Sequence, residues 1–122
     1  MADTQPIGSI QTIMLGVKDL NASVEFYKNV LGLTPKMQSP VLALLDAGAV
    51  TLGLSPGHLR LAPQAAGAME VVFHVPGVRA AQKELASRSV TFLSDPRQVT
   101  ANEWAVHFRD PDGHLLSLFG PE

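Results

Sequence analysis

The predicted order of elements occurs twice along this chain, and this repetition limits the possible folds more than any other feature. Apolar residues alternate along 10–17 and again along 69–75, which predicts two strands that each bury one face. The matching positions, 58 residues apart, are Ile13, Leu15, Val17 and Leu20 in the first half and Val71, Phe73, Val75 and Val78 in the second. We therefore predict two copies of one strand–helix–strand–strand–strand unit, or βαβββ, within a single domain of 122 residues.

The first unit is expected over about residues 8–55 and the second over about 69–120, with a linker rich in Pro, Gly and Ala at about 56–68. In the first unit, Asp19 or Asn21 can cap a helix that Gly32 ends. The second helix is expected at about 78–88. The remaining extended pieces are expected at 35–40, 41–46 and 50–54 in the first unit, and at 90–94, 103–109 and 114–119 in the second.

Composition excludes several classes of function. Nine Lys and Arg against eleven Asp and Glu give a net charge of −2, without the basic surplus that holds phosphates, so we expect no nucleic-acid partner. No apolar run is long enough to span a membrane, and the start of the chain does not resemble a secretory signal. There is no cysteine for disulfides or thiolate chemistry. We expect a cytoplasmic protein.

Two groups of motifs resemble the vicinal oxygen chelate superfamily, which includes glyoxalase I, bleomycin-resistance proteins and extradiol dioxygenases. The N-terminal motifs of the superfamily are similar to Val17-Lys-Asp-Leu20, Ser23-Val-Glu-Phe-Tyr27 and Val30-Leu-Gly-Leu33. Its closing hairpin is similar to Phe108-Arg-Asp-Pro-Asp-Gly-His114 followed by Leu115-Leu-Ser-Leu-Phe119. The resemblance covers about residues 10–120. It implies an α+β fold in which two βαβββ modules form curled mixed sheets around a central cavity, with helices outside. It also implies a homodimer.

Enzymes of this superfamily hold one divalent metal ion with up to four side chains on inward-facing strands. The resemblance places these positions at Thr12, Leu52, Glu70 and Ser117. Leucine cannot ligate, and neutral hydroxyls are weak ligands beside imidazole and carboxylate. We therefore expect the fold without its usual metal site and without a cofactor. The alternative is one divalent metal ion in a rebuilt site that uses Glu70 with His74 or His107.

The residues expected to bind a small organic ligand in the cavity are Thr12, Met14, Glu70, His74, Trp104, His107 and Ser117. Trp104 can serve as a platform for a planar ligand, or it can fill a gap in the core or a dimer interface. Glu70 is the best catalytic candidate, as a general acid or base, or it simply bonds to Thr12 or Ser117. Tyr27 is expected to pack its helix. His114 is expected to face solvent, and His58 to be exposed in the linker.

Two functions of different classes follow. The first is a small-molecule binding protein of the bleomycin-resistance kind, without the catalytic metal. The second is a metal-dependent lyase or dioxygenase of the same superfamily, acting through Glu70 with His74 or His107, or through Glu70 alone as an acid or base. A weaker third possibility is an interaction domain whose cavity is closed by its own side chains.

Overall fold

A computed structural model describes residues 5–6, 9–61 and 69–122 of the chain. The first unit contains β1 (Thr12–Gly16), α1 (Leu20–Glu25), the π-helix η1 (Phe26–Val30), β2 (Thr34–Gln38), β3 (Ala43–Asp46) and β4 (Thr51–Ser55). A short helix, α2 (His58–Leu61), follows. The second unit contains β5 (Glu70–His74), α3 (Val78–Ser87), β6 (Arg97–Gln98), β7 (Trp104–Arg109) and β8 (Leu115–Gly120).

The two units form two four-stranded mixed sheets with the same topology. The strand orders are β1-β4-β3-β2 and β5-β8-β7-β6. In each sheet the first and last strands of the unit pair in parallel, and the other neighbours pair antiparallel. This confirms the predicted repeat and the α+β class. In the part of the chain that is described, neither sheet closes into a barrel.

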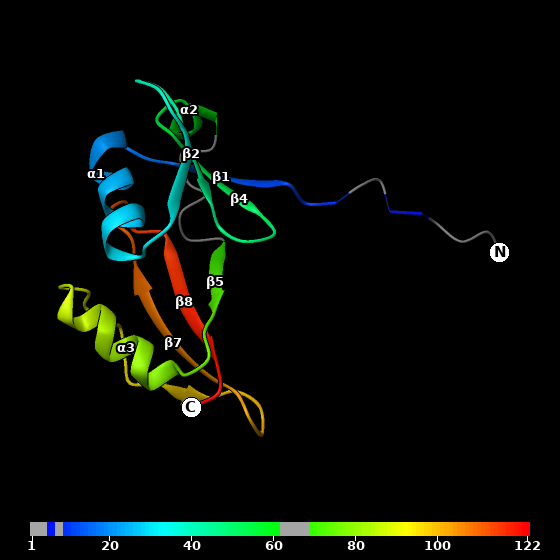
Figure 1. Ribbon diagram of the computed structural model, residues 1–122, viewed down its shortest axis with the longest axis vertical. Coiled ribbons are helices and arrows are strands. Elements are labelled where there is room, and N and C mark those ends of the chain that lie inside the picture. Colours follow the sequence, from blue (N-terminus) through cyan, green and yellow to red (C-terminus); the bar gives the residue numbers. More distant parts are fainter. Residues whose placement is uncertain (1–4, 7–8, 62–68) are drawn as a thin grey trace.

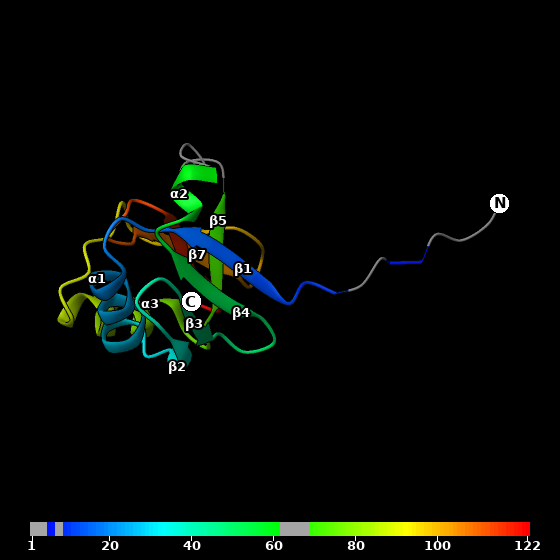
Figure 2. The same cartoon turned by 90° about the horizontal axis from the view of Figure 1, so that it is seen from above.

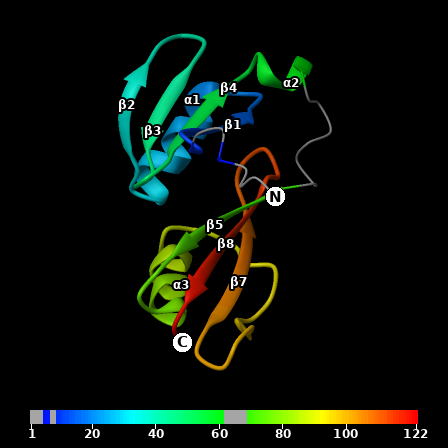
Figure 3. The same ribbon diagram turned by 90° about the vertical axis from the view of Figure 1, so that its right-hand side faces the viewer.

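One helix covers one face of each sheet. The helix α1 packs against β4, and α3 packs against β7 and β8. Figure 1 shows both helices on the same side of the molecule, and Figure 2 shows the same arrangement from above. In Figure 3 the second unit lies below the first. Among the described residues, the opposite face of the second sheet has no helix of its own unit, whereas in the first sheet the short helix α2 contacts β1 beside Gly16.

The first helix begins and ends where the sequence indicates. The Asp19 side chain accepts a hydrogen bond from the Ala22 amide at 3.1 Å, which caps α1. The helix then widens into η1, where the Leu31 amide donates to the Phe26 carbonyl at 3.1 Å. Gly32 follows with a φ of 80°, a left-handed conformation that glycine adopts without strain. The predicted single helix is thus continuous in space but changes its hydrogen-bond spacing.

A single apolar core fills the space between the helices and the sheets. Its largest fully buried side chains include Tyr27 from η1, Leu54 from β4 and Phe108 from β7. Burying a side chain of this size contributes about 1.5–3 kcal/mol each relative to leaving it exposed. The packing role predicted for Tyr27 is confirmed.

Two expectations about the second half of the chain need correction. The predicted strand at 90–94 is reduced to one bridge between Phe92 and Phe108. The segment Ser94-Asp-Pro96 interrupts the pairing with β7, because proline cannot donate a backbone hydrogen bond. Pairing with β7 resumes at β6. The predicted linker contains α2, and its residues 62–68 lie outside the described part of the chain.

No helix in residues 5–6, 9–61 and 69–122 has the length and hydropathy needed to cross a membrane.

The turn between β7 and β8 joins the two units through hydrogen bonds, of which the one from Tyr27 is buried. The Tyr27 hydroxyl donates to Asp110 Oδ2 at 2.7 Å, across 83 residues of sequence. The other carboxylate of the turn, Asp112, accepts from the Lys18 amide at 2.7 Å and from the Ser23 hydroxyl at 3.0 Å. The closing motif of the sequence is therefore a structural contact between the units.

His114 belongs to the same network, and the expectation that it faces solvent is wrong. Its exposed fraction is 9%. Its Nδ1 lies 2.7 Å from Asp110 Oδ2, and its amide donates to Asp110 Oδ1 at 2.8 Å. The turn folds back on itself around the Asp110 carboxylate, and this carries the imidazole inward.

Candidate functional site

Three polar side chains of the second sheet meet on the face that α3 does not cover. Glu70 lies on β5, His107 on β7 and Ser117 on β8, and His107 and Ser117 are directly opposite each other in the ladder. The Ser117 hydroxyl donates to Glu70 Oε2 at 2.6 Å. The His107 Nε2 lies 3.2 Å from the same oxygen. The carboxylate is therefore held in one orientation by neighbours on two other strands.

These three residues line a pocket of about 380 Å³, which we call the Glu70 pocket. Its remaining wall is apolar and consists of Val72, Val99, Ala105 and Phe119. The Glu70 and His107 side chains are 34% and 28% exposed, whereas Ser117 is only 1% exposed. An apolar hollow with a few convergent polar groups is the usual form of a small-molecule site.

The structure brings together some of the predicted ligand-binding residues and separates others. His74 shares the strand face of Glu70, as its even spacing indicates, but it does not line the Glu70 pocket. Trp104 lies on the opposite face of β7 from His107, next to the core, with the Arg79 guanidinium 5.1 Å from its ring centre. The structure therefore places Trp104 in packing, away from this pocket.

Thr12 and Met14 lie on the first sheet, on the face that corresponds to the Glu70 pocket. Thr12 is aligned with Thr51, and Met14 is aligned with Gly53. The expectation that Leu52 shares this face is wrong. Leu52 is aligned with Ile13, is 2% exposed and belongs to the core.

The cause of this error is the turn preceding each final strand. Gly48 lies three residues before the start of β4, whereas Gly113 lies two residues before the start of β8, so counting four residues from each glycine shifts the register by one residue. A shift of one residue turns a side chain to the other face of the sheet. The position that matches Ser117 is Gly53, and Met14 covers it: a side chain built on Gly53 would collide with the Met14 sulfur.

With this register, the positions at which the superfamily resemblance implies metal ligands become Thr12, Gly53, Glu70 and Ser117. Glu70 is the only one of them with a charged ligand group, and Gly53 has no side chain at all. Across the residues that the structure describes, no three His, Asp or Glu side chains are grouped so that they could hold a metal ion. This donor set does not fit a tightly bound transition metal, which takes three or four strong ligands.

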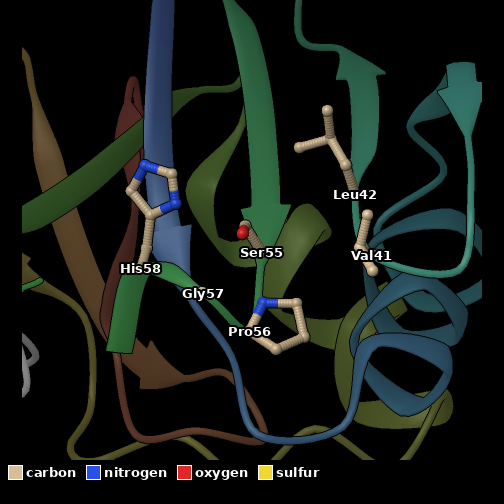
Figure 4. Close-up of a pocket in the computed structure, with 6 residues that line it drawn as sticks. All are labelled: Val41, Leu42, Ser55, Pro56, Gly57 and His58. Atoms are coloured by element: carbon tan, nitrogen blue, oxygen red, sulfur yellow. The ribbon is translucent and has the colours of Figure 1, made fainter. Parts of the chain in front are cut away.

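A second pocket, of about 560 Å³, lies at the end of the first sheet (Figure 4). Its lining residues are Val41, Leu42, Ser55, Pro56, Gly57 and His58. His58 is half-buried in this wall, so the expectation that it is exposed in the linker is wrong. The pocket is larger than the Glu70 pocket, but none of its lining residues carries a carboxylate. It offers one hydroxyl and one imidazole to a ligand.

Sequence reasoning missed several wall residues of the Glu70 pocket. Ala105 and Phe119 lie two residues from His107 and Ser117, so the alternation of strand faces could have identified both. Val99 lies just after β6, where no periodic pattern places a side chain. Exposure of 58% at Val99 and 54% at Val72 makes the rim of the pocket unusually apolar for a free surface.

A family model and several solved structures are similar to this chain, and they agree on its fold. Residues 9–118 match the family model of the Glyoxalase/Bleomycin resistance protein/Dioxygenase superfamily. The fold is similar to a glyoxalase/bleomycin resistance protein/dioxygenase from Nocardioides, at 25% identity and a TM-score of 0.77, covering 97% of this chain and 86% of that chain. A comparison with curated proteins gives no match.

Two further solved structures share the fold. One is TnmS3, an antibiotic-binding protein from Streptomyces sp. CB03234, with 21% identity, a TM-score of 0.80, and 98% of this chain and 100% of that chain covered. The other is a lactoylglutathione lyase from Agrobacterium tumefaciens, with 20% identity, a TM-score of 0.78, and coverage of 93% and 94%. At this level of identity the likeness concerns the fold, which carries both binding and catalysis.

Proposed function

Because this chain belongs to the Glyoxalase/Bleomycin resistance protein/Dioxygenase superfamily, we propose that it is a small-molecule binding protein that works without a tightly held metal ion. The observation that carries the proposal is the Glu70 pocket, in which Glu70, His107 and Ser117 converge within apolar walls. The apolar walls supply affinity for an organic ligand, and the three polar groups fix its orientation. TnmS3, which binds an antibiotic, shows that this fold can serve binding.

The replaced metal positions support the same proposal. In an enzyme of this fold the substrate would coordinate a metal ion at the place where this chain has Thr12, Gly53, Glu70 and Ser117. Here the Ser117 hydroxyl donates a hydrogen bond to Glu70, and Met14 fills the space above Gly53. These contacts engage one oxygen of Glu70 and fill the space beside Gly53, and both support an organic ligand in place of an ion.

The proposed active form is a homodimer. The open face of the second sheet carries exposed apolar side chains, with Val72 54% and Val99 58% exposed. Apolar surface of this kind gains free energy when a second copy covers it. A partner on this face would also close the Glu70 pocket and exclude water from the ligand.

Blocking the pocket tests the binding proposal. We expect the neutral fluorescent compound N-phenyl-1-naphthylamine to bind the wild-type protein and brighten as it leaves water. Ala105→Trp places a large ring in the pocket wall and should abolish the signal, whereas Ala86→Trp, on the exposed side of α3, should retain it. Circular dichroism checks that both variants are folded. Equal binding by the two folded variants would place the ligand elsewhere.

One observation favours the alternative of a metal-dependent lyase or dioxygenase. His107 Nε2 and Glu70 Oε2 lie only 3.2 Å apart, so an imidazole and a carboxylate, two kinds of group that can bind a metal ion, are adjacent in the pocket. His74, the other histidine of that alternative, does not line this pocket. Two protein ligands are fewer than a catalytic zinc site uses, and we therefore rank this function second.

A further inference from the structure

The two contacts of the Glu70 carboxylate leave one side of it open to a ligand. The Ser117 hydroxyl and the His107 ring both approach Oε2. Among the described residues, no hydrogen bond or ion pair is made to Oε1. A carboxylate whose one oxygen is fixed by two neighbours presents the other oxygen in a defined direction. This oxygen can accept a hydrogen bond from a ligand without any rearrangement of the protein.

The charge of this carboxylate is not balanced by a lysine or arginine in the pocket wall. The described lining residues other than Glu70 are one imidazole, one hydroxyl and four apolar side chains. Apolar walls weaken screening by water and so strengthen the attraction of Glu70 for an opposite charge. The Phe119 ring, which lines the same pocket, adds an aromatic face that attracts cations.

We propose that the ligand of the Glu70 pocket carries a protonated amine beside an apolar or aromatic body, and that Glu70 Oε1 binds the amine. This inference rests on the proposed function and specifies the chemical class of its ligand. A charged donor makes a shorter and stronger hydrogen bond with a carboxylate than a neutral donor does. A carboxylate or sulfonate ligand would be repelled by Glu70.

Three probes of nearly equal shape test the inference by isothermal titration calorimetry. They are 1-naphthylmethylamine, which is cationic, 1-naphthalenemethanol, which is neutral, and 1-naphthoate, which is anionic. The amine should bind about tenfold more tightly than the alcohol, and the naphthoate should bind most weakly. Binding of the naphthoate as tightly as the amine would overturn the inference.

The variant Glu70→Gln tests whether Glu70 causes the preference for the amine. It keeps an acceptor for the Ser117 hydroxyl and removes the charge. The amine should lose about tenfold in affinity while the alcohol is unchanged. The matched control Glu25→Gln, on the exposed side of α1, should leave all three affinities as they are. A retained preference for the amine in folded Glu70→Gln would also overturn the inference.

The outcome separates this inference from the proposed function. If all three probes bind equally and Ala105→Trp blocks all of them, the pocket binds organic molecules without selecting an amine, and only the inference fails. If neither these probes nor N-phenyl-1-naphthylamine binds, the proposed function fails as well.

Discussion

At the scale of single residues, the side chain with the most hydrogen bonds in the described part of the chain is a carboxylate that serves structure. Asp110 accepts four hydrogen bonds, from the Tyr27 hydroxyl, the His114 ring, and the amides of Asp112 and His114. Burial and the nearby carboxylates of Asp110 and Asp112 raise the pKa of Tyr27 far above its ordinary range. Glu70, by comparison, has two partners and one free oxygen. The difference separates a group that holds the fold from a group that is available to a ligand.

The raised pKa of Tyr27 predicts a loss of stability in alkaline solution. Above about pH 10 the unfolded chain releases the phenolic proton while the folded chain keeps it. The unfolded state then binds fewer protons, so the free energy of unfolding falls by about 1.4 kcal/mol per pH unit from this group alone.

Tyr27→Phe isolates this effect, because the chain has one tyrosine. The variant should be less stable by about 1 kcal/mol at pH 7, since one buried hydrogen bond is lost and Asp110 keeps its other donors. Its stability should fall less steeply than that of the wild type above pH 10. Urea unfolding measured from pH 7 to 11 gives both quantities. Parallel loss of stability in the two proteins would contradict the assignment.

At the scale of elements, the strand faces and the start of the first helix could be predicted from the sequence, because each depends on residues that are neighbours in the chain. Strands with one buried face, such as β1 and β5, were found because neighbouring side chains point to opposite faces. The pairing of Glu70 with Ser117 was one of two expected alternatives, and it rested on the superfamily resemblance, which placed both residues at facing positions. Leu52 was placed on the wrong face because Gly48 lies one residue further from its following strand than Gly113 does. His114 was placed wrongly because no local pattern shows a turn folding back onto a distant helix.

Substitutions of Gly53 and Gly120 should differ in their cost to stability, because a side chain would meet different neighbours at the two positions. A side chain at Gly120, at the end of β8, would collide with the backbone carbonyl of Val75, and the hydrogen bond from the Val75 amide to the Phe119 carbonyl restrains this backbone. A side chain at Gly53 would meet the flexible end of Met14, which can turn away.

We expect Gly120→Ala to lower the free energy of unfolding by about 3 kcal/mol and Gly53→Ala by less than about 1 kcal/mol. Chemical denaturation of the two variants checks this order. Equal losses would show that the approach of β8 to Val75 is less rigid than described.

At the scale of the whole molecule, the two units share one core, but the open faces of their sheets carry different side chains. The first sheet presents Thr12 and Met14 on its open face, and the second presents the Glu70 pocket. The open face of the second sheet keeps apolar side chains exposed in the single chain, which leads to the proposed dimer.

Sedimentation should therefore give twice the 13.0 kDa mass of one chain. Val72→Lys should shift the protein towards the monomer, because it places a charge on the surface to be covered. Lys83→Arg, on the exposed side of α3, is the control and should remain dimeric. A wild-type protein of single-chain mass at micromolar concentration would exclude the dimer.

The central claim is that the Glu70 pocket receives an organic ligand and is not a metal centre. It is tested most directly by the metal content of protein purified without any chelator, measured by elemental analysis for zinc, nickel, manganese and iron. We predict far less than one equivalent of any of these per chain. One tightly held equivalent, lost in Glu70→Gln, would contradict the claim and favour the metal-dependent enzyme.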